Sequence, residues 1–148
     1  MSICNWFKKK KEVEVEVGLE PPVSTNEIGT ADLRSIFQWM APNADLFLSD
    51  RTYRLCHTED IERFLVQDAT DREDYQAERY DCDDFAYRLM GQFSVPDWSD
   101  LTIGIVWTNV HALNCVVDED RQFWFVEPQT DELVKVLEGV DTIRMIMM

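Results

Sequence analysis

The sequence is poor in positive charge and has no long apolar run. It contains 14 Lys and Arg residues against 29 Asp and Glu, which gives a formal net charge of −15 at pH 7. A surface of that sign repels phosphate backbones and anionic lipid head groups, so nucleic acid is not an expected partner. No segment approaches the roughly 18 apolar residues that a membrane helix needs, and we expect no transmembrane segment.

The start of the chain lacks the pattern of a secretory signal. In MSICNWFKKKK the basic run follows a very short apolar stretch instead of preceding a long one. We therefore expect a cytoplasmic protein, whose source could be a phage or a bacterium. The Pro-, Gly- and Ser-containing stretch GLEPPVSTNEIG is typical of a linker. We expect residues 1–29 to form a flexible N-terminal segment and linker, and residues 30–148 to form one domain.

Histidines are few, and none of the cysteines are spaced as a CxxC pair. The four cysteines are Cys4, Cys56, Cys82 and Cys115. A chain of this size closes a core without disulfides, so we expect reduced thiols. Because His57 and His111 are the only two imidazoles, a general base of that type can come from two positions only.

Hydrophobic spacing predicts helices in the first half of the chain and strands in the second. Apolar residues recur at helical spacing in TADLRSIFQWMA, HTEDIERFLVQDA and CDDFAYRLMGQF, with Thr30 and Thr58 as expected caps of the first two helices. Between the first two helices, LFLSDRTYRLC has short strand-like pieces. Runs rich in Val, Ile, Phe and Trp follow the third helix: LTIGIVWT, VHALNCVVD and QFWFVEPQ. The intervening DEDR has a suitable length for a hairpin turn. This order predicts an α+β fold with N-terminal helices packed on an antiparallel sheet.

One cysteine stands at a predicted helix start. Cys82 begins the third helix, where the helix dipole and unpaired backbone N–H groups favour a thiolate, although three carboxylates are its neighbours in the sequence. The acids Asp81, Asp83 and Asp84 are expected to cap that helix, with a solvated face or part of a Ca²⁺ site as the alternatives.

A base and an orienting acid can be proposed from the hairpin. His111 opens the strand HALNCVV, and a turn centred on Glu119 places it roughly opposite Glu127. Cross-strand partners stand about 5 Å apart on one face, so Glu127 is expected to orient the imidazole. Together with Cys82 this predicts a nucleophile, base and acid arrangement.

These strings also carry a resemblance. CDDFA, a strand that opens with HA, and WFVEPQT resemble the transglutaminase-like core over residues 80–130. The resemblance implies a papain-like α+β scaffold on which Cys82, His111 and Glu127 act on a peptide or amide substrate through a thioester. We therefore expect a cysteine hydrolase of the protease or amidase kind, and the sequence does not separate hydrolysis from transfer to an amine, as in transglutaminases. The DCDDFA string with a Cys, His, Glu order also resembles the papain-like C-terminal domain of certain fungal lectins, which makes Ca²⁺ a cofactor to consider, although the sequence requires none. In papain-like enzymes a Gln six residues before the cysteine contributes to the oxyanion hole, and Gln76 has that position.

Several alternatives stay open. YDCDDFAYRLM also resembles the NlpC/P60 cell-wall peptide hydrolases, although the EPQT ending argues against that family. Cys115 lies four residues after His111 on the same predicted strand, so a zinc site is conceivable, but two further ligands are missing. Cys82 can also be a buried structural thiol. The rival from another class is a non-catalytic binding or accessory protein, for example from a phage.

Overall fold

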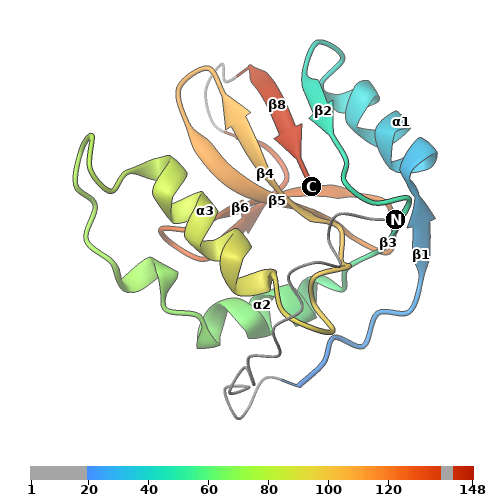
Figure 1. Cartoon of the computed structure of the whole chain (residues 1–148), viewed down its shortest axis with the longest axis horizontal. Helices are drawn as coiled ribbons and strands as arrows, with labels where there is room; N and C mark the ends of the chain where they lie inside the picture. The colour runs from blue at the N-terminus through green and yellow to red at the C-terminus, as the bar shows by residue number, and fades with distance from the viewer. Residues whose placement is uncertain (1–19, 138–141) are drawn as a thin grey trace, which may run out of the picture.

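The computed structural model describes residues 20–137 and 142–148 and has an α+β architecture (Figure 1). A small sheet pairs β1 (Glu27–Gly29) with β3 (Thr52–Arg54). The main sheet has six strands in the order β2-β8-β4-β5-β6-β7. Their bounds are β2 Asp45–Phe47, β8 Ile143–Met147, β4 Ile103–Thr108, β5 Ala112–Val117, β6 Phe123–Glu127 and β7 Glu132–Val134. The α+β class predicted from the sequence is confirmed.

The main sheet is mixed, whereas the sequence predicts an antiparallel one. β2 runs parallel to β8, and the pairs β8-β4, β4-β5, β5-β6 and β6-β7 are antiparallel. The strand-like pieces expected in LFLSDRTYRLC overlap β2 and β3, but such short pieces do not indicate the parallel pairing of β2 with β8. The papain-like part of the fold prediction is not confirmed.

Three α-helices form where the apolar spacing predicts them: α1 (Thr30–Met40), α2 (Thr58–Gln67) and α3 (Cys82–Phe93). A short 3₁₀ turn, η2 (Thr70–Arg72), follows α2. The predicted threonine caps are wrong, because the capping positions are Gly29 and His57. The Thr30 hydroxyl donates instead to the Asp50 carbonyl.

The helices cover both faces of the main sheet. Leu33 and Phe37 of α1 pack with Leu113 and other residues of one sheet face. Side chains of α2 and α3 pack on the opposite face, where Leu89 meets Val116. Because successive side chains of a strand alternate between faces, β5 contributes to both cores. Figure 1 shows the sheet between α1 and α3.

The turn between β5 and β6 lies one residue further along the chain than the sequence predicts. Val117 pairs with Phe123 and Asn114 with Val126, so the hairpin is centred on Asp120 instead of Glu119. The cross-strand partner of each β5 residue therefore lies two positions later in the chain than the sequence predicts. Asp118 explains the shift, because its Oδ1 accepts from the Gln122 N–H at 2.8 Å and fixes the turn on that side.

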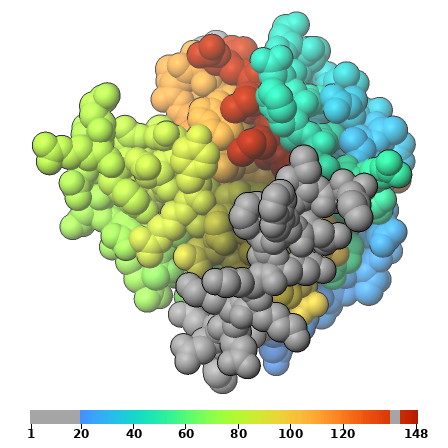
Figure 2. All heavy atoms as spheres, in the orientation of Figure 1, coloured from blue at the N-terminus to red at the C-terminus, as the bar shows by residue number. Residues whose placement is uncertain are grey.

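The segment before α1 is partly ordered against the domain. Residues 1–19 of the predicted flexible segment lie outside the described residues. Within residues 20–29, Ser24 is buried and β1 pairs with β3. The polar segment between α2 and α3 projects from the body of the molecule, at the left of Figure 2. Among the described residues, no helix is long and apolar enough to cross a membrane.

Candidate functional site

Cys82 is the first residue of α3, and the acids around it organise the helix start. Asp81 is the N-cap, and Asp81 and Asp84 form a reciprocal capping box in which the Asp81 N–H donates to Asp84 Oδ2 at 3.2 Å. Two of the predicted capping acids thus engage backbone N–H groups that the helix leaves unpaired. Cys82 itself is half-buried.

The third acid of this group pairs with the first. Asp81 and Asp83 share a side-chain hydrogen bond, which raises the pKa of Asp83 and lowers the pKa of Asp81. A ligand atom of each of Asp81, Cys82 and Asp83 lies within 4.8 Å of the others. This set offers two carboxylates and one thiol, whereas Ca²⁺ takes six to eight oxygen ligands. These three residues alone therefore do not complete a Ca²⁺ site, and the Ca²⁺ expectation stays a prediction.

The structure brings His111 and Glu127 together as the sequence predicts. His111 Nε2 lies 2.7 Å from Glu127 Oε2, and the two side chains are about one quarter exposed, at 26% and 23%. With the observed register they are diagonal neighbours across the pair, a separation that long side chains can bridge. The predicted contact is confirmed, although the predicted turn centre is not.

Thr108, which the sequence reasoning missed, positions the backbone of His111. Its Oγ1 accepts from the N–H groups of His111 (2.9 Å) and Val110 (3.2 Å), and it also donates to the His111 carbonyl at 3.1 Å. These bonds close the connection between β4 and β5. The imidazole therefore starts from a fixed backbone position.

Gln129 was also missed, and it holds the other oxygen of Glu127. Both its backbone N–H and its side-chain amide donate to Glu127 Oε1, at 3.2 and 3.3 Å. The Glu127 carbonyl accepts from the N–H of Asp131 at 2.9 Å. The string EPQT carries this signal, since a polar residue two positions after an acid can close a turn onto its carboxylate. The carboxylate is thereby oriented toward His111.

Cys82 packs at the end of the β4-β5 pair. It lies against a small apolar cluster that contains Ala112 and Trp107, and Ala112 directly follows His111 in the chain. Trp107 pairs with Ala112 across the two strands. Tyr87, one and a half turns along α3, has its ring centroid 5.6 Å from that of Trp107. An aromatic pair therefore borders the surface that Cys82 shares with the start of β5.

A buried amide fixes α3 to the sheet beneath this surface. Asn114 is fully buried, and its Nδ2 donates to the carbonyls of Ala86 in α3 (3.0 Å) and Gly104 in β4 (3.3 Å). The sequence gives no direct sign of this role, because an Asn within an apolar strand is compatible with many packings. Asn114 sets how far Cys82 stands from the strands.

Gln76 lies in the exposed segment before α3. Its backbone closes a turn with Tyr80, in which Gln76 N–H donates to the Tyr80 carbonyl at 2.8 Å. Among the described residues, no hydrogen bond joins its side chain to Cys82. Its role as an oxyanion donor stays a prediction.

The other described cysteines are buried in the core. Burial raises the pKa of the Cys56 thiol to about 12 and raises that of Cys115 well above its ordinary range. The three-residue group at Cys82 is the one potential metal cluster found in the described residues, and it includes neither Cys115 nor His111. A zinc site at those two residues is thus not supported.

No family model matches the sequence, and no curated protein matches it. Solved structures do share its fold, among them the following two. One is the PSL1a–E64 complex, with a TM-score of 0.71, 18% sequence identity, and coverage of 82% of this chain and 51% of that chain. The other is Polyporus squamosus lectin bound to the human-type influenza-binding epitope Neu5Acα2-6Galβ1-4GlcNAc, with a TM-score of 0.69, 18% identity, and coverage of 82% and 49%. The chain spans about half the length of these structures, and the likeness is one of fold.

These findings correct the assignment to the transglutaminase-like and papain-like cysteine protease superfamily. One of these two structures is named as a lectin, and neither title names a transglutaminase or a papain-like enzyme, so the description as a cysteine protease is not supported. The sequence motifs on which that assignment rests cover residues 80–130. In the structure they correspond to a capped helix start and to the ends of two paired strands. Such local geometry is compatible with more than one family. Of the resemblances read from the sequence, only the one that involved a lectin agrees with the neighbours in name.

Proposed function

We propose that the protein is a binding module, that its ligand is a carbohydrate, and that the ligand is held at the surface around His111, Glu127 and Trp107. One of the two fold neighbours is a lectin with a glycan bound, which supports a carbohydrate as the class of ligand. The location rests on the His111–Glu127 contact of 2.7 Å and on the Tyr87–Trp107 pair, since Trp107 pairs across the strands with Ala112, the residue after His111.

The chemistry of that surface fits a sugar. A pyranose ring has an apolar C–H face and a rim of hydroxyl groups that both donate and accept hydrogen bonds. Glu127 offers acceptors and the Gln129 amide offers donors at fixed positions, while Tyr87 is half exposed and offers a ring face. Orientation of the carboxylate before binding reduces the ordering cost that the ligand has to overcome.

The test is a titration with a panel of neutral and sialylated oligosaccharides. Glu127→Gln keeps the shape of the side chain and removes its charge, so we expect it to weaken binding by about tenfold, the loss expected for one charge-assisted hydrogen bond. Glu62→Gln, on the exposed face of α2, is the matched control and should bind like the unmodified protein. Equal affinity of the two variants, or no binding by any glycan of the panel, would contradict the proposal.

A second candidate function follows from the position of Cys82. Cys82 lies at the start of α3 and packs against the apolar cluster that includes Ala112, the residue after His111, and its thiolate could attack the carbonyl of a bound amide or ester. The bond to the leaving group breaks as the thioester forms, His111 passes the thiol proton to that group, and Glu127 orients the imidazole. Water then attacks the thioester, which releases the acid and restores the thiol. Gln76 is the proposed oxyanion donor of this alternative.

Thiol alkylation separates the two candidates. Under the second, iodoacetamide at neutral pH should modify Cys82 much faster than the buried Cys56, and His111→Ala should slow that reaction. If Cys82 reacts no faster than Cys56 and His111→Ala has no effect, the second candidate is wrong. Under the first, Cys82→Ala leaves glycan affinity unchanged. The expected Ca²⁺ effect is tested separately, since a melting temperature that is equal in millimolar Ca²⁺ and in chelator would contradict it.

A further inference from the structure

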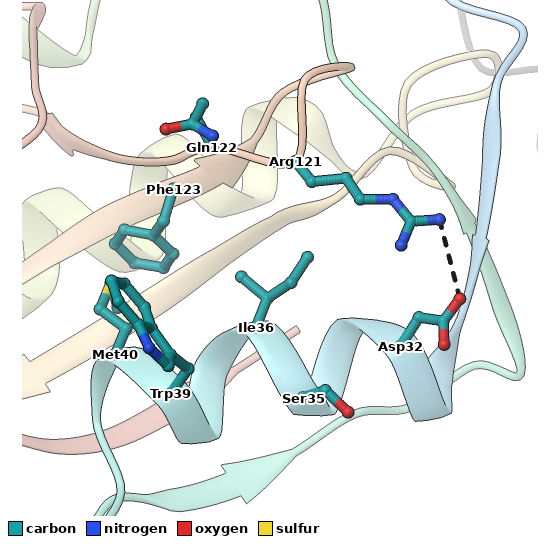
Figure 3. Close-up of a pocket in the computed structure, with 8 residues that line it drawn as sticks. All are labelled: Asp32, Ser35, Ile36, Trp39, Met40, Arg121, Gln122 and Phe123. Carbon is teal, nitrogen blue, oxygen red and sulfur yellow. Dashed lines mark ion pairs between the residues drawn. The ribbon is translucent and has the colours of Figure 1, made fainter.

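A groove lies between α1 and the start of β6. It has a volume of about 480 Å³. Eight residues line it: Asp32, Ser35, Ile36, Trp39, Met40, Arg121, Gln122 and Phe123. None of them belongs to the surface around His111 and Glu127. Figure 3 shows Trp39, Met40 and Phe123 gathered at one end and Asp32 and Arg121 at the other, with Ile36 between them.

Trp39 gives the groove an aromatic wall. Its side chain is 88% exposed, although α1 has a buried stripe, formed by Leu33 and Phe37, that anchors the helix. Trp39 is two positions from Phe37 and so points away from that stripe. The buried Phe123 and the half-buried Ile36 form the apolar floor beneath it. A large, exposed indole at the rim of a groove lined by apolar side chains offers a flat face to a ligand.

The opposite end of the groove is polar but carries no net charge. Asp32 Oδ2 and Arg121 Nη2 lie 3.7 Å apart, and both side chains are more than half exposed. Arg121 takes the left-handed conformation, with φ of 60°, in the turn before β6. Asp118 holds this turn by accepting from the Gln122 N–H at 2.8 Å. The turn therefore presents Arg121 and Gln122 in a fixed arrangement.

These features select the class of ligand. An anionic ligand would meet a chain whose formal net charge is −15, and a cationic or anionic one would have to break the Asp32–Arg121 pair. A neutral ligand can use both charged groups at once, one as an acceptor and one as a donor. A ligand with an apolar face and several hydroxyl groups satisfies both ends of the groove, and a neutral pyranose is such a ligand.

We propose that the groove between α1 and β6 is a second carbohydrate-binding site, which takes a neutral pyranose with its C–H face on Trp39 and its hydroxyls between Asp32, Arg121 and Gln122. This site goes beyond the proposed function, because it is separate from the surface around His111 and Glu127 and makes each chain bivalent. The inference rests on the proposed function for its ligand class only.

Fluorine NMR of the full chain labelled with 5-fluorotryptophan tests both sites in one titration. The sequence has five tryptophans, and Trp39→Phe and Trp107→Phe identify the two resonances of interest. Methyl glycosides of glucose, galactose, mannose and N-acetylglucosamine are the probes. We expect at least one of them to shift the Trp39 resonance in a saturable manner. Trp39→Ala removes this reporter, so its affinity for the same glycoside is measured by isothermal titration calorimetry and should be about tenfold lower, as the loss of an aromatic face implies.

Asp32→Asn provides the conservative variant, and it should weaken binding without altering the melting temperature. Val66→Ala, on the exposed face of α2, is the control and should bind like the unmodified protein. A glycoside that shifts Trp107 but not Trp39 overturns this inference and leaves the proposed function standing. A glycoside that shifts Trp39 but not Trp107 supports this inference and contradicts the location given under the proposed function. If no glycoside shifts either resonance, both are wrong, and a shift of Trp39 by an apolar peptide alone also overturns the inference.

Discussion

Replacement of Asn114 by Ala tests how the candidate site is held in place. The side chain is fully buried in β5 and joins three elements, since Nδ2 donates to Ala86 O in α3 and to Gly104 O in β4. Its Oδ1 has no hydrogen-bond partner among the described residues. The substitution therefore removes two donated bonds and one unsatisfied buried oxygen at the same time.

The expected loss of stability follows from these three terms. Each hydrogen bond contributes about 1 kcal/mol net, so the two together contribute about 2 kcal/mol. The void left by the amide adds a cost of about 1 kcal/mol, and removal of the unpaired oxygen returns about 1 kcal/mol. We expect Asn114→Ala to lower the free energy of unfolding by about 2 kcal/mol.

Urea unfolding followed by far-ultraviolet circular dichroism measures this change. Asn43→Ala, in an exposed turn, is the control and should stay within about 0.5 kcal/mol of the unmodified protein. Because Asn114 ties α3 to the sheet near Cys82, the variant should also alkylate at Cys82 at a changed rate in native buffer. A free energy of unfolding within about 0.5 kcal/mol of the unmodified value would refute the reasoning that this amide holds α3.

Two further substitutions test other parts of the fold. Burial and the nearby Asp71 raise the pKa of Asp131 to about 6. Between about pH 4 and pH 6 the folded state therefore keeps a proton that the unfolded state has lost. The free energy of unfolding falls as the pH rises through this range. With the shift discounted for partial exposure, Asp131→Asn should raise the free energy of unfolding at pH 7 by about 1 kcal/mol and have little effect at pH 4. Urea unfolding measures both values, and equal effects at the two pH values would contradict this expectation. Gly104→Ala places a Cβ atom 2.5 Å from the backbone oxygen of Met147, so β4 and β8 must separate. We expect a loss of about 3 kcal/mol in the same assay, and a melting temperature equal to that of the unmodified protein would contradict it.

The sequence predicts the long, strongly patterned elements well, because apolar periodicity reports burial directly. The spacing of Leu33 and Phe37, and of Phe85 and Leu89, places all four side chains in the core, as observed. It does not predict that β2, within the strand-like segment LFLSDRTYRLC, pairs parallel with β8. The partner and direction of so short a strand depend on tertiary contacts, which the local pattern does not specify.

The contact between His111 and Glu127 could be predicted because it is local in the hairpin. The observed turn centre differs by one position from the predicted one. The two residues are still diagonal neighbours across the hairpin, so their long side chains meet. The residues that fix this pair were not predictable in the same way. Thr108 and Gln129 act through backbone N–H groups of a turn, and that geometry depends on loop conformations that the sequence does not specify.

β6 links the two proposed ligand sites. Phe123, at its start, forms part of the floor of the α1 groove, and Glu127, at its end, contacts His111. Four residue steps along a strand span about 13 Å, which is beyond the range over which substitutions usually interact. A variant of Trp39 and a variant of Glu127 should therefore reduce binding independently. Because both sites are anchored to one rigid strand, a ligand that reaches from one to the other gains effective concentration at the second site, whereas small glycosides do not.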